Sequence, residues 1–159
     1  MDEIKQVFRE FGFTVEEDRL PEAVVYSVAR TFNLFAREFA QAYKRFGLTP
    51  ASFNLLLLLQ NGEEKDTFTQ HRVGELLVVT PSNMSGLIDR MEQKGRVRRV
   101  PGPDRRSKIL QITPKGTQLL EQVWPHHEEV VKRLPKALNY EETKTLVKML
   151  ARMRHSLAA

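Results

Sequence analysis

The sequence contains no cysteine. This absence excludes disulfide bonds, a catalytic thiol and thiol-based redox sensing. No apolar run of about eighteen residues is present, so no membrane-spanning helix is predicted. The first residues, MDEIKQVFRE, are too charged for a secretory signal. We therefore expect a cytoplasmic protein without membrane association.

Motifs of enzyme active sites are also missing. The chain has no Gly-rich phosphate loop, nucleophile elbow, metal motif or paired carboxylate. The nearest approach to a metal site is the pair His126 and His127, followed by Glu128, with His71 or His155 as a further ligand. Adjacent helical residues point about 100° apart and rarely bind one ion together. We expect no enzymatic activity, cofactor or metal, and a metal-responsive regulator using His126 and His127 is kept as an alternative.

The positive charge of the chain is concentrated in one stretch. The chain carries a net +5 at pH 7, whereas residues 81–115 hold nine Lys or Arg against three acids, a local net of +6. The rest of the chain therefore sums to −1. A local positive field of this kind is typical of a protein that reads duplex DNA. A winged helix that binds protein is the alternative, although it would need no phosphate neutralisation.

The basic stretch predicts a helix followed by a hairpin. Thr80 is a candidate N-cap whose hydroxyl would accept from a backbone N–H, Pro81 suits the first helical turn, and Gly95 can end the helix. Alternation in residues 96–100 and 108–113 predicts two strands around a turn. The helix should bury one face, made of Met84, Leu87, Ile88 and Met91.

Two shorter helices are predicted before this one. Thr49 and Pro50 open the first, which includes the apolar run 55–59. The second covers residues 70–77, with Val73, Leu76 and Leu77 turned inward and with Gly74 packed against the next helix. Together with the helix from Pro81, the second would form a helix-turn-helix.

Long helices are predicted near both ends of the chain. Residues 21–46 form one that is closed by Gly47, residues 114–134 form another that is kinked at Pro125, and residues 139–157 form the last. Residues 1–19 contain a short amphipathic helix, either an ordered extension or a frayed arm. In the helix at 21–46, apolar residues recur every three or four positions, which is close to the seam of a coiled coil. This seam indicates either a core shared with a second copy or a core within one chain. Its residues are Val24, Val28, Phe32, Phe35, Phe39, Ala42 and Phe46.

The order of these elements resembles the MarR family of winged helix-turn-helix transcriptional regulators. The resemblance is carried by LTPASFNLLLLL, LVVTPSNMSGLIDRMEQKG and PGPDRRSKILQIT, and it covers roughly residues 21–157. It implies a mainly α (α+β) fold: an extension at 1–20, a DNA-binding lobe with a two-stranded wing at 49–113, and a helical dimerisation region from 21–48 and 114–159. It also implies a homodimer on a pseudo-palindromic duplex operator. We expect a repressor, with an activator as the alternative, because the effect depends on where the operator lies relative to the promoter.

The resemblance also implies which residues contact DNA. In the helix, the positive end of the helix dipole favours phosphate, the Ser and Asn side chains can bond base edges, and Arg90 can reach phosphate or guanine. The candidates are Thr80, Pro81, Ser82, Asn83, Ser85 and Arg90. In the wing, Arg106 and then Arg105 are the candidates for the minor groove. Asp104 either orients Arg106 or caps its own turn. Many members carry a large basic residue where this chain has Gly86, so the operator sequence cannot be carried over.

Members of the family often bind small aromatic or anionic effectors that release DNA. The candidates for such a pocket are aromatic residues: Tyr26, Phe39, Tyr43, Phe53 and Trp124. Plain core packing is the alternative for these candidates and is favoured for most of them, whereas Trp124, beside Pro125, is the first choice for the pocket.

Overall fold

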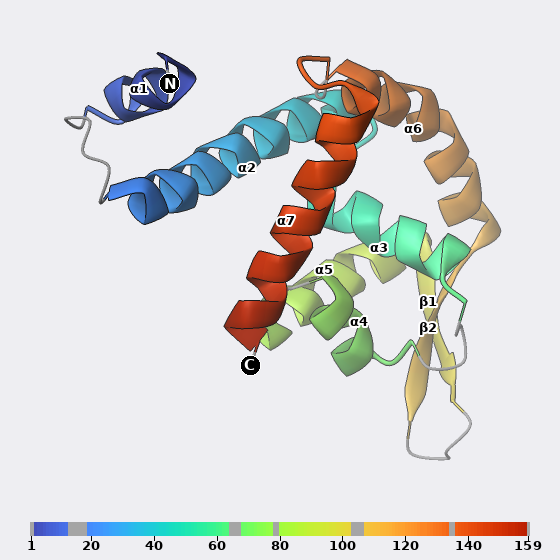
Figure 1. The fold of residues 1–159 in the computed structure, drawn as a ribbon. Coiled ribbons are helices and arrows are strands. Elements are labelled where there is room, and N and C mark those ends of the chain that lie inside the picture. The colour runs from blue at the N-terminus through green and yellow to red at the C-terminus, as the bar shows by residue number, and fades with distance from the viewer. Residues whose placement is uncertain are drawn as a thin grey trace.

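A computed structural model describes residues 2–12, 19–63, 68–77, 80–102, 107–133 and 136–158. Helices dominate these residues, with one two-stranded antiparallel sheet. Figure 1 shows the elements in chain order: α1 Asp2–Glu10, α2 Leu20–Lys44, α3 Pro50–Asn61, α4 Gln70–Leu77, α5 Pro81–Gln93, β1 Val97–Pro101, β2 Lys108–Ile112, α6 Pro114–Arg133 and α7 Tyr140–Ala158.

The helix boundaries follow from local chemistry. Thr49 and Ser52 form a capping box at the start of α3, in which the Ser52 N–H donates to Thr49 Oγ1 at 3.2 Å and the Thr49 N–H donates to Ser52 Oγ at 2.7 Å. Gly47 and Gly95 adopt φ values of +62° and +65° after α2 and α5, as helix-ending glycines do. Thr80 is the N-cap of α5, but its side chain makes no capping hydrogen bond. The predicted hydroxyl contact is therefore wrong, and its backbone alone makes the cap.

The core lies between α3, α5, the hairpin and the facing parts of α2 and α6. The apolar run of α3 supplies Leu55, Leu56 and Leu59, all buried. The predicted inner face of α5 is confirmed, because its four apolar residues are all buried: Met84, Leu87, Ile88 and Met91.

The prediction that Leu76 turns inward is wrong, because its side chain is 44% exposed. Val73 and Gly74 are the buried residues of α4. At about 100° per residue, Leu76 lies roughly 110° around the helix from the midpoint between Val73 and Gly74. A helix of eight residues on the surface of the lobe packs along one narrow edge, and Leu76 falls outside it.

The hairpin is tied to the helices on either side. Its register pairs Val97 with Ile112 and Pro101 with Lys108. On the outer side of β2, the N–H of Leu110 donates to the carbonyl of Phe68 at 2.9 Å, just before α4. Beyond the core the two strands extend away from the helices (Figure 1).

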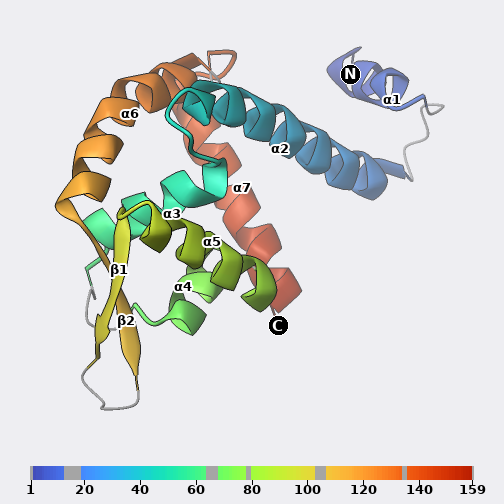
Figure 2. The same ribbon diagram turned by 180° about the vertical axis from the view of Figure 1, so that it is seen from behind.

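The remaining helices leave large apolar surfaces uncovered. α2 projects from the body, and α6, which contains Pro125, is curved along its length (Figure 2). Among its residues with described burial, α7 buries none, although the predicted capping box is present between Asn139 and Glu142. On α2, the side chain of Phe32 is 67% exposed. The predicted N-terminal helix is present as α1, whose Phe8 is buried.

Among the described residues, no helix has the length and apolar content that crossing a bilayer requires.

Candidate nucleic-acid interface

α5 presents an exposed polar surface. Thr80, Ser82 and Asn83 at its start and Arg90 in its last turn are all exposed. They line a groove of about 450 Å³ together with Thr49 and Ala51 at the start of α3 and with Gly86 and Leu87. The structure thus brings four of the predicted helix residues onto one surface. The side chain of Pro81 lies outside the description.

Gly86 makes room for the side chain of Arg90. A Cβ on Gly86 would lie 3.2 Å from Nη1 of Arg90, so the guanidinium extends back over this bare position of the helix. The positive charge that a basic residue at position 86 would supply is therefore brought close to the same place by a residue one turn later. This part of the groove therefore holds a cation, although Gly86 itself has no side chain.

Ser85 occupies a different environment from the other helix candidates. It is half-buried, and its Oγ accepts a hydrogen bond of 2.6 Å from Nε2 of Gln70 at the start of α4. This contact joins the two helices of the helix-turn-helix, so it helps to hold the angle between them. Gln70 could not be found from the sequence, because its partner Ser85 lies fifteen positions later in the chain.

The predicted wing residues Asp104, Arg105 and Arg106 lie outside the described residues. The strands that lead to them carry further cations. Arg98 and Lys108 are exposed, and Arg98 Nη2 donates to Oε1 of the cross-strand Gln111 at 3.0 Å.

Two arginines of the basic stretch are engaged within the protomer. Arg96 donates from Nη1 to the carbonyl of Gly47 at 3.2 Å and from Nη2 to that of Phe46 at 3.3 Å, at the C-terminal end of α2. Burial lowers the pKa of Arg96. Arg99 bonds Asp89 and Glu92 of α5, and the hydrogen bond to Asp89 is the main cause that raises the pKa of Arg99. Both arginines belong to the positive field that the sequence predicts to face DNA, but their guanidinium groups are bonded within the protomer.

The aromatic candidates for an effector pocket gather where α2, α3 and α6 meet. His127 lies at the centre: its ring centroid is 4.7 Å from that of Phe53, 5.2 Å from Trp124 and 5.5 Å from Phe39. Its Nδ1 is hydrogen-bonded to the Tyr43 hydroxyl at 2.7 Å. Burial lowers the pKa of His127 and raises that of Tyr43.

Tyr26 is not part of this cluster. It lies near the start of α2, where its ring centroid is 5.5 Å from that of Phe11, after α1. Four of the five predicted aromatic residues are thus brought together, with His127 as an added member that the sequence analysis weighed only as a metal ligand.

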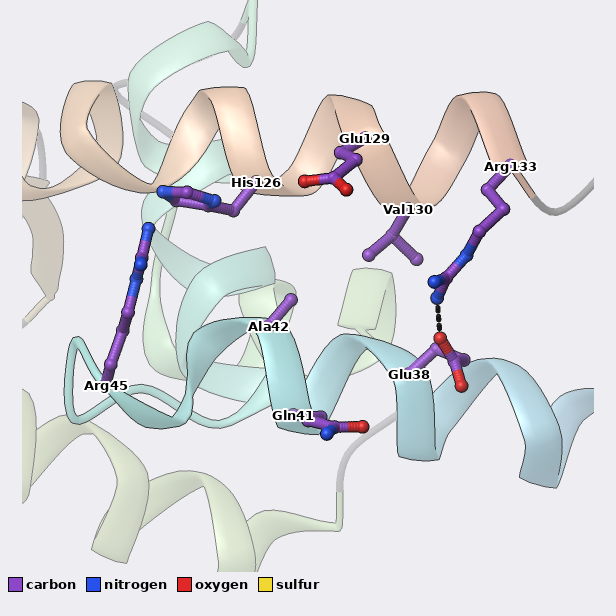
Figure 3. A pocket seen from close by; sticks show the side chains of 8 residues that line it. All are labelled: Glu38, Gln41, Ala42, Arg45, His126, Glu129, Val130 and Arg133. Atoms are coloured by element: carbon purple, nitrogen blue, oxygen red, sulfur yellow. Dashed lines mark ion pairs between the residues drawn. The ribbon is translucent and has the colours of Figure 1, made fainter.

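His126 faces a second hollow, away from the His127 cluster. Figure 3 shows it at one end of a groove of about 360 Å³ between α2 and α6, near Arg45, with an ion pair between Arg133 and Glu38 at the other end. The two histidines therefore have different neighbours. No group of three or more possible metal ligands occurs among the described residues.

Known proteins are similar to this chain in sequence and in fold. A sequence profile of the MarR family matches residues 46–107. The HTH-type transcriptional regulator PecS of Dickeya dadantii is 26% identical over 138 residues, 86% of this chain and 83% of PecS. An uncharacterized HTH-type transcriptional regulator of Bacillus thuringiensis subsp. konkukian is 30% identical over 115 residues, 71% of this chain and 75% of the relative.

A solved structure of the transcriptional repressor CouR, bound to a 23-mer DNA duplex, is also similar. It superposes with a TM-score of 0.74 and 27% identity, covering 89% of this chain and 99% of CouR.

Proposed function

The chain belongs to the MarR family of winged helix-turn-helix transcriptional regulators, and we propose that its homodimer represses transcription by binding a pseudo-palindromic operator. It is a DNA-binding regulator. α5 is the recognition helix, whose N-terminal half enters the major groove, and the wing, residues 97–112, reaches the flanking minor groove.

The observation that carries the proposal is the local charge around an exposed polar helix face. Residues 81–115 hold a net +6 in a chain of net +5. The exposed Ser82 and Asn83 can donate to and accept from base edges, and Arg90 reaches phosphate or guanine from the same groove. At the wing tip, Arg106 and then Arg105 are proposed for the minor groove, with Asp104 orienting Arg106.

The uncovered apolar surfaces support the proposed dimerisation region, residues 21–48 and 114–159. α2 exposes Phe32 and Phe35, and α7 exposes Leu146 and Met149. Contiguous apolar surface of this kind marks a site of protein–protein contact. A second copy covers them and sets the distance between the two recognition helices. Residues 1–20 are proposed as an N-terminal extension. In its described part, Phe11 packs against Tyr26 of α2 and Glu10 pairs with Arg30.

The cluster around His127 supports an effector site for a small aromatic or anionic molecule. Aromatic rings from α2, α3 and α6 meet there, between the proposed dimerisation region and the DNA-binding lobe. A planar ligand that separated the rings of Phe53 and His127 would move α3 against α6. That shift would change the spacing of the recognition helices.

The protein acts on DNA in the cytoplasm and is a regulator, not an enzyme. A protein-binding winged helix has no need for the concentrated positive charge. The separate surroundings of His126 and His127 argue against a shared metal ion.

Selection from random duplexes tests the proposal most fully. The purified protein is incubated with a random-sequence library, and the retained DNA is sequenced. We expect inverted half-sites whose centres are about 10 base pairs apart, one turn of the double helix. Retention of unrelated sequences in the same proportions as the input library would contradict sequence-specific binding.

A further inference from the structure

Arg99 of β1 links the wing to the recognition helix through both its side chain and its backbone. Its Nη2 donates to Asp89 Oδ1 at 2.6 Å, and its Nη1 donates to Glu92 Oε2. Its backbone N–H donates to Glu92 Oε1 at 3.0 Å. Asp89 and Glu92 are three positions apart on α5, so they share the flank of the helix that faces the strand.

Arg99 is the best shielded of the three side chains in this bridge. The side chain of Arg99 is 24% exposed, although those of Asp89 and Glu92 are 56% and 39% exposed. A guanidinium held between two carboxylates forms directional, charge-assisted hydrogen bonds. The neighbouring Arg98 differs, because it is exposed and bonds only the cross-strand Gln111 among the described contacts.

The position of Arg99 along the strand determines what the bridge can do. Val97, at the base of the wing, is buried in the core, whereas Pro101 is exposed where β1 leaves the lobe. Arg99 lies between them and is the furthest point along β1 with a described hydrogen bond to α5. The direction in which the outer wing leaves the lobe therefore depends on this contact.

We propose that Arg99 is a positioning residue for DNA binding, which fixes the wing against the recognition helix so that both reach adjacent grooves of one duplex. This inference rests on the proposed function, because it requires that α5 and the wing contact the same DNA. Arg99 itself acts through Asp89 and Glu92 and touches no base.

Charge alone would give a different result from positioning, and a pair of substitutions separates them. Arg99→Gln removes one positive charge and breaks the bridge. The double variant Asp89→Asn, Glu92→Gln breaks the same bridge but removes two negative charges. If charge were decisive, the double variant would bind DNA more tightly than the wild type. If positioning is decisive, both variants lose the wing contacts.

The test is footprinting on a selected operator, at protein concentrations that saturate each variant. Hydroxyl-radical protection reports the wing in the flanking minor groove, and protection of guanine N7 from methylation reports the recognition helix in the major groove. We expect Arg99→Gln and the double variant to lose the flanking protection and to keep the N7 protection. We expect their affinity to fall on the order of tenfold or more. Arg98→Gln removes one positive charge from the same strand but leaves the bridge intact, so we expect it to bind more weakly and yet to keep both protections at saturation.

Thermal melting of every variant shows whether it is folded, and Arg99→Lys is the second variant if Arg99→Gln does not fold. A lysine cannot bridge two carboxylates with a planar fork, so it should also lose the flanking protection. Unchanged flanking protection in folded Arg99 variants, or tighter binding by the double variant, would overturn the positioning role. A wild-type protein without any footprint would instead refute the proposed function.

Discussion

Replacing Gly116 with alanine probes the contact between α6 and the base of the wing. Gly116 is buried in the first turn of α6, and a Cβ there would overlap the backbone oxygen of Arg96 and lie 2.7 Å from Cγ1 of Ile112. The same oxygen accepts a hydrogen bond of 3.1 Å from the N–H of Thr113. It cannot move aside without weakening this bond, so helix and hairpin must separate.

The magnitude follows from two opposing terms. Overfilling a packed site costs about 1–3 kcal/mol, and the obstacle here is backbone, which favours the upper part of that range. Alanine in place of glycine within a helix gains up to about 1 kcal/mol. We therefore expect Gly116→Ala to lower the free energy of unfolding by about 2 kcal/mol.

Gly86→Ala is the matched control. Its Cβ would approach only Nη1 of Arg90, the end of a flexible side chain, so the variant should be up to about 1 kcal/mol more stable than the wild type. Urea unfolding measures the free energy of unfolding of the two variants and the wild type. The protomer concentration is kept fixed, because the stability of a dimer depends on it. Equal stability of the two alanine variants would refute the described contact of Gly116 with Arg96 and Ile112.

Three further outcomes are expected. Arg106→Ala should weaken operator binding by about 1–3 kcal/mol in a gel shift without changing the melting temperature, and unchanged affinity would contradict the wing assignment. The wild type should be a dimer by light scattering at micromolar concentration and Phe32→Glu a monomer, because the exposed apolar seam includes Phe32; a monomeric wild type would count against the dimer. Burial lowers the pKa of His127, so the unfolded chain binds a proton first as pH falls. In urea unfolding, the free energy of unfolding should decrease below about pH 6.5 in the wild type and decrease less in His127→Phe. Identical pH profiles of the two proteins would contradict this role of His127.

The elements of the fold could be predicted from the sequence because their signals are local. Pro50 after Thr49, Pro81 after Thr80 and the glycine after α5 act within one turn of chain. The apolar spacing of α5 identified its buried face, and the alternation on either side of residues 101–104 predicted the hairpin. Each signal needs only neighbouring residues, so no knowledge of the tertiary structure was required.

The partners of individual side chains could not be predicted in the same way. Arg96 bonds carbonyls about fifty positions earlier in the chain, and His127 bonds a tyrosine eighty-four positions away. A basic residue in a basic stretch looks the same whether it faces solvent or bridges two carboxylates, as Arg99 does. Likewise Tyr26 resembles Tyr43 in the sequence, although only Tyr43 reaches the level of α3 and α6.

Titration of the protein with a duplex at two salt concentrations tests DNA binding by the α5 and wing surface most directly. Each phosphate neutralised by Lys or Arg releases counterions, so the logarithm of the binding constant should fall linearly with the logarithm of salt concentration. With several such contacts we expect affinity to drop by about 10³-fold or more between about 50 and 200 mM salt. Absence of binding, or binding that does not change with salt, would contradict the account.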